Sequence, residues 1–365
     1  MYFDPEPKKD LKDLYNRTEE LEKFNETLEY SNLITIIGPR RTGKTSFMNV
    51  ALKESNQPYI QLDLRGLSFN PSQADIIRKI EATFNNLNKK WLTSIVASLK
   101  QVTGVSILGA SISLNWSKEG VNLTELFDTV NKWAETKKQK FLIAFDEIQL
   151  IRGEKEIPRL FAHIMDYNSN IRIIVTGSEI GLLFDFLGFD NPDSPLYGRY
   201  YTEINMKPFN QEDSLEFLQA GFKQTGVQPN REILEKATIA LDGIVGWLTL
   251  FGTRCREADQ ANEAILEQVI IEGGKLARAE AQKLTQYSKR YSVTINYLAK
   301  AKKASWSQIK SIMEANEGRT LPNSTTSDIL NKLIKTNLVM KDNGEYSIPD
   351  PLLINAVLKD PIPEK

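Results

Sequence analysis

Two patterns of hydrophobic residues, short apolar runs and apolar residues at helical spacing, alternate along the chain up to residue 209. Short apolar runs rich in β-branched residues occupy 33–38, 58–66, 140–151, 171–178 and 202–209. Runs of this kind, ended by glycine or polar residues, are typical of strands buried on both faces of a parallel sheet. Between them, apolar residues recur at helical spacing within 17–30, 71–100, 123–137 and 159–167. The alternation predicts an α/β fold in which helices cover both faces of a parallel sheet.

One stretch of this region follows a different pattern. Residues 101–117 are uncharged and alternate apolar and polar side chains on either side of Gly109-Ala110. This pattern predicts a β-hairpin inserted near 103–117. The hairpin either packs against the edge of the sheet or extends as a contact arm for a partner.

After Phe209 the pattern is helical, with expected helices at 212–222, 231–241, 247–257 and 261–287. Further helices are expected at 287–300, 305–315 and 325–335, before two extended pieces joined by Asp342-Asn343-Gly344. Asn-Gly between two extended pieces is a hairpin signal, and three helices with a hairpin form a winged helix-turn-helix. The sequence therefore predicts an α/β core at 1–208, a helical lid subdomain at 209–284 and a winged-helix domain at 285–365.

Composition excludes several classes of protein. The 365 residues include 46 Lys+Arg and 47 Asp+Glu, a formal charge of -1, so the chain is no uniformly basic nucleic-acid coat. Cys255 is the only cysteine, so an intramolecular disulfide is excluded. His163 is the only histidine, so a zinc site would need carboxylate ligands beside Cys255 and His163, and any histidine catalysis would depend on His163 alone. The start of the sequence has no apolar signal region and no run is long and apolar enough for a membrane span, so we expect a cytoplasmic protein.

A phosphate-binding motif follows the first predicted strand. The sequence matches G-x-x-x-x-G-K-S/T and its next residue is a serine: Gly38, Pro39, Arg40, Arg41, Thr42, Gly43, Lys44, Thr45 and Ser46. The glycines allow the backbone N–H groups to point inward at phosphate oxygens, and the following helix directs its positive end at the same anion. We expect Lys44 to contact the β- and γ-phosphates and the Thr45 hydroxyl to bind Mg²⁺. These residues predict that the chain binds ATP or ADP.

A pair of carboxylates ends another predicted strand. Five apolar residues at 141–145 precede Asp146 and Glu147, and ligands of α/β sheets bind at this carboxyl edge. Asp146 is expected to hold Mg²⁺ with Thr45, and Glu147 to orient the attacking water. The alternative is that the two carboxylates merely open a loop. Their pairing with the phosphate loop favours a P-loop ATPase core and hydrolysis over simple binding.

Polar residues near the last two strands are further candidates. Thr176 and Ser178 end the strand at 171–178, where a hydroxyl can reach the γ-phosphate or the water, or can cap the next helix. Arg199 precedes the strand at 202–209. It is a candidate catalytic residue, as a γ-phosphate sensor or an arginine finger acting within the chain or across a subunit interface. A surface ion pair is the other interpretation.

The motifs together resemble those of the archaeal ATPase family, within the wider STAND and AAA+ class of P-loop NTPases. The resembling segments, in chain order, are 15–21, 38–46, 141–149, 175–178, 195–199, 206–209, 242–248 and 346–352. The resemblance extends over nearly the whole chain and implies an ATPase core, a helical subdomain and a winged helix. It also implies that Arg17 lies beside the adenine.

The region 285–341 is locally basic. It holds ten Lys or Arg and three Asp or Glu, a net excess of seven positive charges. The third helix of this region begins with short Ser and Thr side chains suited to phosphates or base edges. Its lysines Lys332 and Lys335, with Lys341 on the wing, are candidates for contacts with duplex DNA. The alternative is a solvated winged helix that packs against the ATPase core.

These observations favour an Mg²⁺-dependent, ATP-hydrolysing molecular switch that couples its nucleotide state to domain rearrangement and to an unidentified protein partner. One alternative is a DNA-binding AAA+ loader or remodeller resembling replication initiators. Another is a nucleotide sensor without turnover.

Overall fold

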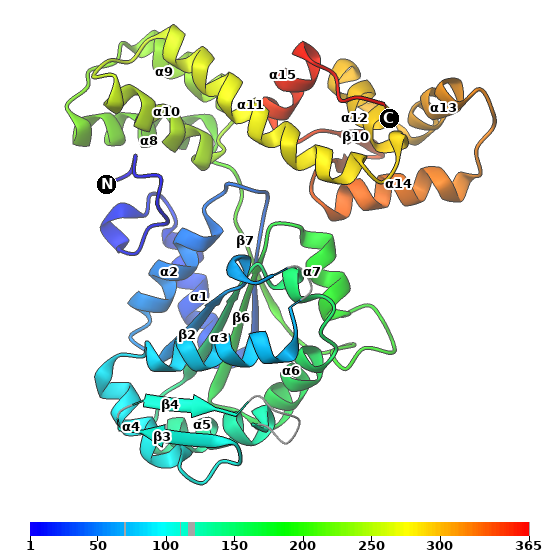
Figure 1. Cartoon of the computed structure of the whole chain (residues 1–365). Coiled ribbons are helices and arrows are strands. Elements are labelled where there is room, and N and C mark those ends of the chain that lie inside the picture. Colours follow the sequence, from blue (N-terminus) through cyan, green and yellow to red (C-terminus); the bar gives the residue numbers. More distant parts are fainter. Residues whose placement is uncertain (69–70, 110, 116–120, 365) are drawn as a thin grey trace.

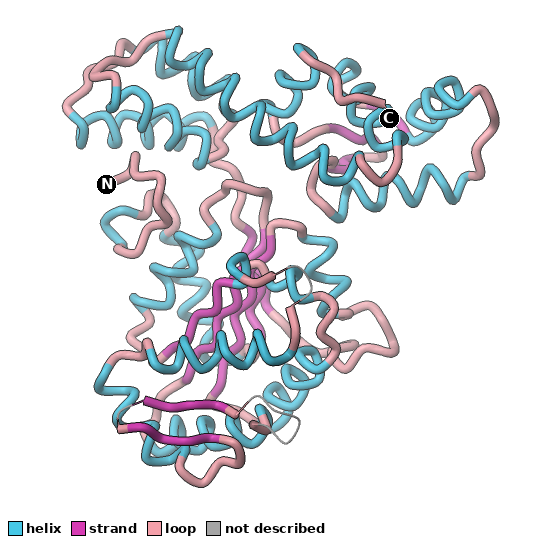
Figure 2. Tube along the Cα trace, in the orientation of Figure 1, coloured by secondary structure: helices cyan, strands magenta, loops and turns pink. Residues whose placement is uncertain are grey.

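The computed structural model of the chain describes residues 1–68, 71–109, 111–115 and 121–364. Figure 1 shows an α/β part below two groups of helices, with the long helix α11 (Glu263–Thr285) running from one group to the other. The amino-terminal residues lie between the α/β part and the first helical group. The tube view in Figure 2 shows the central sheet with one end close to the junction between the α/β part and the helical groups.

The central sheet has five parallel strands in the order β2-β5-β6-β1-β7. The strands are β1 (Leu33–Ile37), β2 (Tyr59–Asp63), β5 (Phe141–Asp146), β6 (Ile171–Gly177) and β7 (Thr202–Asn205). Every residue of β1, β5 and β6 is buried, which explains why their sequences are apolar without alternation. The predicted P-loop fold with helices on both faces is confirmed. Because β6 lies between β1 and β5, the polar ends of these three strands meet at one edge.

Helices cover both faces of the sheet, as Figure 1 shows. One face packs against α1 (Thr18–Tyr30) and α2 (Lys44–Glu54). The other packs against α3 (Gln73–Asn85), α5 (Leu123–Thr136) and α6 (Glu156–Tyr167), with α4 (Lys89–Leu99) and α7 (Ile180–Leu187) at its periphery. The helical pattern over 71–100 forms two helices, because Asn88 begins the second by accepting a hydrogen bond from the Lys90 N–H.

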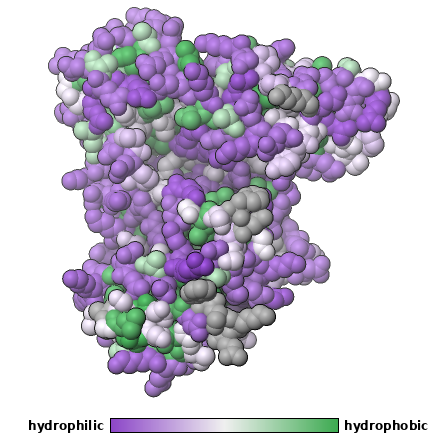
Figure 3. All heavy atoms as spheres, in the orientation of Figure 1, coloured by the Kyte–Doolittle hydropathy of each residue, from purple (hydrophilic) through white to green (hydrophobic). Residues whose placement is uncertain are grey.

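The predicted hairpin is present as β3 (Val105–Leu108) and β4 (Ser111–Leu114), which pair antiparallel. Of the expected 103–117 insertion, Ala110 and residues 116–117 lie outside the described residues. The hairpin forms its own small sheet and packs on α3, where the Asn85 amide donates to the Ile112 carbonyl at 2.9 Å and accepts from its N–H at 2.8 Å. Figure 3 shows hydrophobic side chains on the surface over β3 and β4, where Leu108 is 70% exposed.

The two helical groups share one hydrophobic core. The first contains α8 (Gln211–Thr225), α9 (Arg231–Leu241), α10 (Val245–Glu257) and α11. The second is a winged helix with α12 (Lys289–Ala301), β8 (Ala304–Ser305), α13 (Trp306–Glu317), α14 (Asn323–Lys335), β9 (Met340–Asp342), β10 (Glu345–Ser347) and α15 (Pro351–Lys359). Since α11 is continuous and packs against α15, the boundary near residue 285 remains a prediction.

Short helical turns connect several of these elements in the described part of the chain. Three 3-10 turns are present: η1 (Leu11–Asp13), η2 (Leu64–Gly66) and η3 (Ile148–Ile151). Across the described ranges, no helix combines the length and apolar character needed to cross a membrane.

The amino-terminal segment is anchored in the first helical group, which sequence periodicity did not indicate. Phe3 is fully buried, and its ring fills the space above two glycines. A Cβ atom at Gly221 would lie 2.2 Å from this ring, and one at Gly252 would lie 2.3 Å from it. Further along, the Lys8 N–H donates to the Ser46 hydroxyl at 3.0 Å. The segment therefore joins the helical group to the start of α2.

Replacing Phe3 with alanine should destabilise the protein, because it leaves a cavity over Gly221 and Gly252. We expect a loss of about 3 kcal/mol in the free energy of unfolding, measured by denaturant titration. Leu11→Ala is the control: Leu11 lies in the same segment but is 48% exposed, so its loss should stay within about 0.5 kcal/mol. Equal effects of both variants would contradict the anchoring role of Phe3.

Candidate nucleotide-binding site

The phosphate loop connects β1 to α2 by a turn that only glycine accommodates at two positions. Gly38 has φ +148°, and a Cβ there would lie 2.4 Å from the Met206 carbonyl oxygen. Gly43 has φ +88° and forms the N-cap of α2. Lys44 folds back over the loop, and its Nζ donates to the carbonyl oxygens of Gly38 at 2.9 Å and Pro39 at 2.7 Å. The loop is thus curled around the position expected for phosphate.

Lys44 is 6% exposed. Burial lowers the pKa of its ammonium to about 8, although the negative charges of Glu147 and Asp146 oppose the shift. The ammonium bonds only to neutral carbonyl oxygens among the residues that the structure describes. A phosphate group in the loop would therefore supply the anionic partner that suits this buried cation.

Asp146 lies at the end of β5 and is 1% exposed. Its carboxylate accepts hydrogen bonds from Thr45 Oγ1 at 3.0 Å and Thr176 Oγ1 at 2.5 Å, and pairs with the Arg65 guanidinium at 3.0 Å. Burial raises the pKa of Asp146, and the bonds from Thr176 and the charge of Arg65 partly counteract this. The oxygens of Thr45 and Asp146 match the hard oxygen ligands of Mg²⁺, which completes its shell with water and phosphate.

Glu147 follows Asp146 with the backbone in the left-handed region, at φ +59°. Its Oε2 accepts three hydrogen bonds: from the Gln149 amide at 2.5 Å, the Ser178 N–H at 3.0 Å and the Ser178 hydroxyl at 2.9 Å. Burial opposes ionisation, but the Ser178 bonds and the Lys44 charge outweigh it, so the pKa of Glu147 is below its usual value. Glu147 is therefore a carboxylate at neutral pH, held through one oxygen.

The residues that end β6 hold these carboxylates. Thr176 bonds to Asp146 and accepts from the Glu147 N–H at 3.0 Å, while Ser178 bonds to the Glu147 side chain. The sequence leaves two roles open for these hydroxyls, contact with the γ-phosphate or the water and capping of the next helix. In the structure they bond to the two acids at this edge of the sheet, and a contact with the γ-phosphate or the water remains a prediction.

A cavity of about 350 Å³ adjoins the phosphate loop on the side of the helical lid. Its lining includes Thr42 and Ser46 of the loop, Val245 and Trp247 of α10, and Arg17. Cavities of this size and largely apolar lining are typical of small-molecule sites.

Arg17 is 7% exposed and is held in place by three neighbours. It donates to the Lys207 carbonyl and to Glu20, both at 2.8 Å, and its guanidinium lies 4.7 Å from the Phe209 ring centre. The structure thus brings Arg17 to the cavity, and its proximity to adenine remains a prediction.

Two arginines of the loop join it to the rest of the molecule. Arg40 pairs with Glu179 at 2.8 Å, next to Ser178. Arg41 donates two hydrogen bonds to Glu280 of α11, at 2.7 and 3.2 Å, and its guanidinium lies 4.2 Å from the Trp247 ring centre. Asp350, from the winged helix, lies 3.9 Å from Arg41 and accepts from the Trp247 indole at 3.2 Å.

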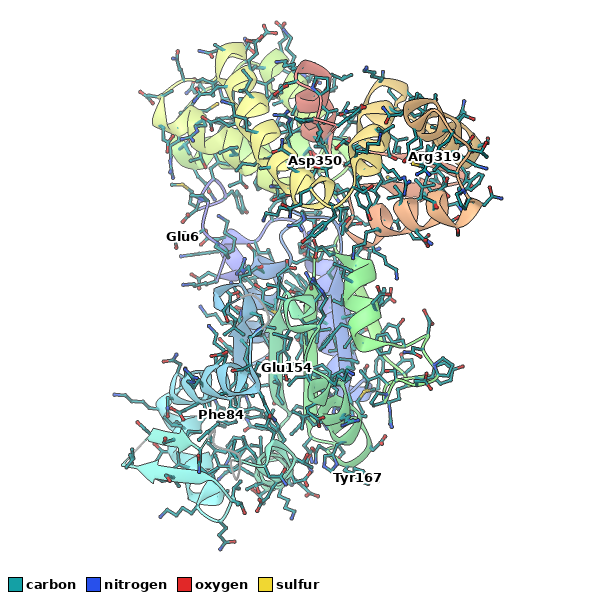
Figure 4. The ribbon with its side chains drawn as sticks, turned by 45° about the vertical axis from the view of Figure 1, so that its right-hand side comes forward. Glu6, Phe84, Glu154, Tyr167, Arg319 and Asp350 are labelled. Atoms are coloured by element: carbon teal, nitrogen blue, oxygen red, sulfur yellow. The ribbon has the colours of Figure 1, made fainter. Side chains whose placement is uncertain are left out.

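Figure 4 shows Asp350 at this junction, whereas Arg319 lies on the distant end of the winged helix. The nucleotide loop therefore contacts both helical groups directly through the side chains of Arg40 and Arg41.

Arg199 lies away from the phosphate loop. It precedes β7, whose Thr202 pairs with Ile34 near the start of β1, so Arg199 is at the amino edge of the sheet. The loop begins after Ile37 at the opposite edge, about 20 Å away at ordinary strand rise. Arg199 pairs with Asp166 and donates to the Pro195 carbonyl at 2.8 Å. A γ-phosphate contact within the same chain is therefore wrong, and a contact across a subunit interface remains a prediction.

Several site residues escaped sequence reasoning. Arg65 follows β2 and pairs with both Asp63 and Asp146, Gln149 holds Glu147, and Glu280 and Asp350 hold Arg41. Arg65 had a usable signal, because β2 ends at the same sheet edge as β5. Glu280 and Asp350 had none, since their positions depend on how the helices pack.

Comparison with protein-family models gives two matches. Residues 14–251 match the model described as an ATPase domain predominantly from Archaea. Residues 286–348 match the MCM protein C-terminal winged helix-turn-helix domain. The comparison with curated proteins gives no match.

Solved structures with the same fold cover nearly the whole chain. The chain is 30% identical to the Walker-type ATPase of Pyrococcus abyssi, with a TM-score of 0.84 over 98% of this chain and 100% of that one. It is 13% identical to the ORC2 protein of Aeropyrum pernix, solved in ADPNP-ADP complexes, with a TM-score of 0.61 over 95% of this chain and 94% of that one. The second likeness concerns the fold alone.

The affinity for ATP should fall as the pH rises above about 8, because Lys44 of the nucleotide-free protein then loses its proton. Phosphate restores the charge, so binding takes up one proton and the dissociation constant rises by up to about tenfold per pH unit. Isothermal titration calorimetry at pH 7 and pH 9, in buffers with different ionisation enthalpies, measures both quantities. Proton uptake that is the same at both pH values would contradict a lowered pKa of Lys44.

Proposed function

Because the chain belongs to the family of ATPase domains found predominantly in Archaea, we propose that it binds ATP with Mg²⁺ and hydrolyses the γ-phosphate bond. The observation that carries this proposal is the meeting of the phosphate loop with two carboxylates at one sheet edge, the buried Asp146 and the partly buried Glu147. Thr45 Oγ1 lies 3.0 Å from Asp146, and the charges of Lys44 and Glu147 interact. Each group has the chemistry that phosphoryl transfer to water requires.

In this proposal the phosphates lie in the curl of the loop, where Lys44 exchanges its carbonyl partners for phosphate oxygens. Thr45 and Asp146 hold Mg²⁺, which neutralises charge on the phosphates when bound. Glu147 accepts no hydrogen bond at Oε1 from the described residues, so this oxygen is available to orient the attacking water. The nucleoside occupies the cavity beside Arg17 and Trp247.

We further propose that the chain acts as a switch of the STAND or AAA+ type. The support is the contact of Arg40 and Arg41 with Glu179, Glu280 and Asp350, which joins the helical lid and the winged helix to the nucleotide loop. A change of phosphate charge at the loop alters the electrostatic potential at these arginines. It therefore changes the strength of their ion pairs with the three carboxylates. In this proposal, a protein partner binds the chain in a way that depends on the resulting rearrangement.

Arg199 has a separate place in the proposal. It lies at the amino edge of the sheet and pairs with Asp166, and we propose that it acts on the site of a neighbouring subunit. As an arginine finger it would stabilise charge on the transferred phosphoryl group of that neighbour.

Glu147→Gln should bind ATP but hydrolyse it at least 100-fold more slowly, roughly the loss typical for a residue that activates the nucleophile. Glutamine keeps the size of the side chain and removes the charge that polarises water. Phosphate release measures turnover, and equilibrium dialysis with labelled ATP measures binding. Lys44→Ala is the companion variant, expected to lose binding itself. Wild-type turnover by the Glu147→Gln variant would show that Glu147 does not activate water.

Binding of duplex DNA is the second candidate function, favoured by the winged-helix match and by the distribution of lysines. Lys335 pairs with Asp185 of α7 at 2.7 Å, so this end of α14 contacts the ATPase core. Lys302 and Lys303 precede β8, and Lys341 lies on β9 of the same small sheet. All three are exposed, which favours the wing over α14 as the DNA contact.

Lys302→Glu combined with Lys303→Glu should weaken duplex binding on all sequences alike, because these lysines would bind phosphates. The slope of log K against log[salt] should become shallower by about 0.9 for each phosphate that the protein no longer neutralises. Fluorescence anisotropy with a labelled duplex measures both. Lys359→Glu, on α15 and outside the small sheet, is the control for a change of surface charge at another position. No binding by the wild type at low salt, with or without ATP, would exclude the DNA function.

A further inference from the structure

The end of α14 contacts the segment that carries the acid-holding residues. Asn337, two residues after α14, donates from its side-chain amide to the Ser178 carbonyl at 3.1 Å, across 159 residues of sequence. The same interface contains the Lys335–Asp185 ion pair. It is also close-packed, since a Cβ added at Gly181 would lie 2.6 Å from the Lys335 Cα. The winged helix is therefore docked on the segment 178–185.

Ser178 lies at the centre of this contact. Its N–H and hydroxyl both donate to Glu147 Oε2, while its carbonyl accepts from Asn337. The next residue, Glu179, holds Arg40 of the phosphate loop. One short segment thus bonds to the candidate water-activating acid, to the nucleotide loop and to the winged helix.

We propose that Asn337 is a positioning residue for hydrolysis, which fixes Glu147 through the backbone of Ser178. The inference rests on the proposed ATPase function. With the Ser178 carbonyl anchored, its N–H and hydroxyl stay directed at Oε2, and Oε1 keeps one orientation toward the water. Without the anchor the segment 178–179 gains freedom, and a carboxylate displaced by a fraction of an ångström activates water less well.

Asn337 also has a local structural role. It adopts φ +60°, a conformation that asparagine and glycine tolerate, and it ends α14 in the left-handed cap. Glycine retains this backbone conformation and removes only the amide. Asn337→Gly therefore separates the bond to Ser178 from the cap.

The test compares steady-state ATP hydrolysis by the full-length wild type and Asn337→Gly. We expect kcat to fall by about fivefold to tenfold, the usual effect of one hydrogen bond, with KM for ATP within about twofold. Asn337→Asp, which places an acceptor against the carbonyl, should fall at least as far. A loss of stability alone would lower the amount of active protein and so the apparent kcat. The concentration of active sites is therefore measured by nucleotide binding, and kcat is calculated from it.

A second variant tests the same docking from the other side. Gly181→Val places a side chain against Lys335 and should lower kcat in the same way, while Gly153→Val, where a Cβ meets nothing within 4 Å, should leave it unchanged.

Unchanged kcat in Asn337→Gly and Gly181→Val, with an active wild type, would overturn the positioning role and leave the ATPase proposal intact. An increase in kcat would overturn it too, by showing that docking restrains Glu147. A wild type that binds ATP without any turnover would overturn both proposals.

Discussion

The arrangement of the whole chain depends on the ion pairs of Arg40 and Arg41 in the phosphate loop. Arg41 lies between Glu280, the Trp247 ring and Asp350, which come from the two helical groups. The carbonyl of Arg41 also accepts the Gly246 N–H at 2.9 Å, so the start of α10 rests on the loop. These side chains are partly buried, where charge pairs are screened less than on the surface. The loop that binds phosphate is thereby also the attachment point of the lid.

This attachment has a consequence for nucleotide binding. Burial raises the pKa of Asp350, and the charge of Arg41 counteracts it, so the carboxylate remains ionised more readily while the pair is formed. Breaking the pair leaves a partly buried acid without its cation, which is unfavourable. In the proposed switch, a phosphate group in the loop and Asp350 would compete for the charge of Arg41. This competition is the route by which the nucleotide would affect the winged helix.

Sequence reasoning succeeded where the chemistry is local. The strands, the phosphate loop and the carboxylates at the end of β5 follow from short patterns whose spacing reflects backbone geometry, and the strands form the expected parallel sheet. It failed where the partners are distant in sequence: Phe3 against Gly221 and Gly252, Asp350 at Arg41, and Asn337 at Ser178. These contacts depend on how the amino-terminal segment, the helices of the first group and the winged helix pack together. The placement of Arg199 failed for a related reason, since a residue before a parallel strand lies at the edge opposite the ligand.

The winged helix has two regions with different surroundings: the end of α14 and the wing. Their separation determines which surface is left for DNA when the winged helix contacts the ATPase core. The end of α14 is occupied by the core through Lys335 and Asn337. The wing instead carries Lys341 on β9, and Lys302 and Lys303 lie just before β8 of the same small sheet, all with exposed side chains. A duplex on the wing therefore need not displace α14 from Ser178. If the wing binds a duplex as proposed, nucleic acid and the docked core occupy separate surfaces of the winged helix. DNA would then affect hydrolysis by moving the winged helix as a whole rather than by competing for one surface.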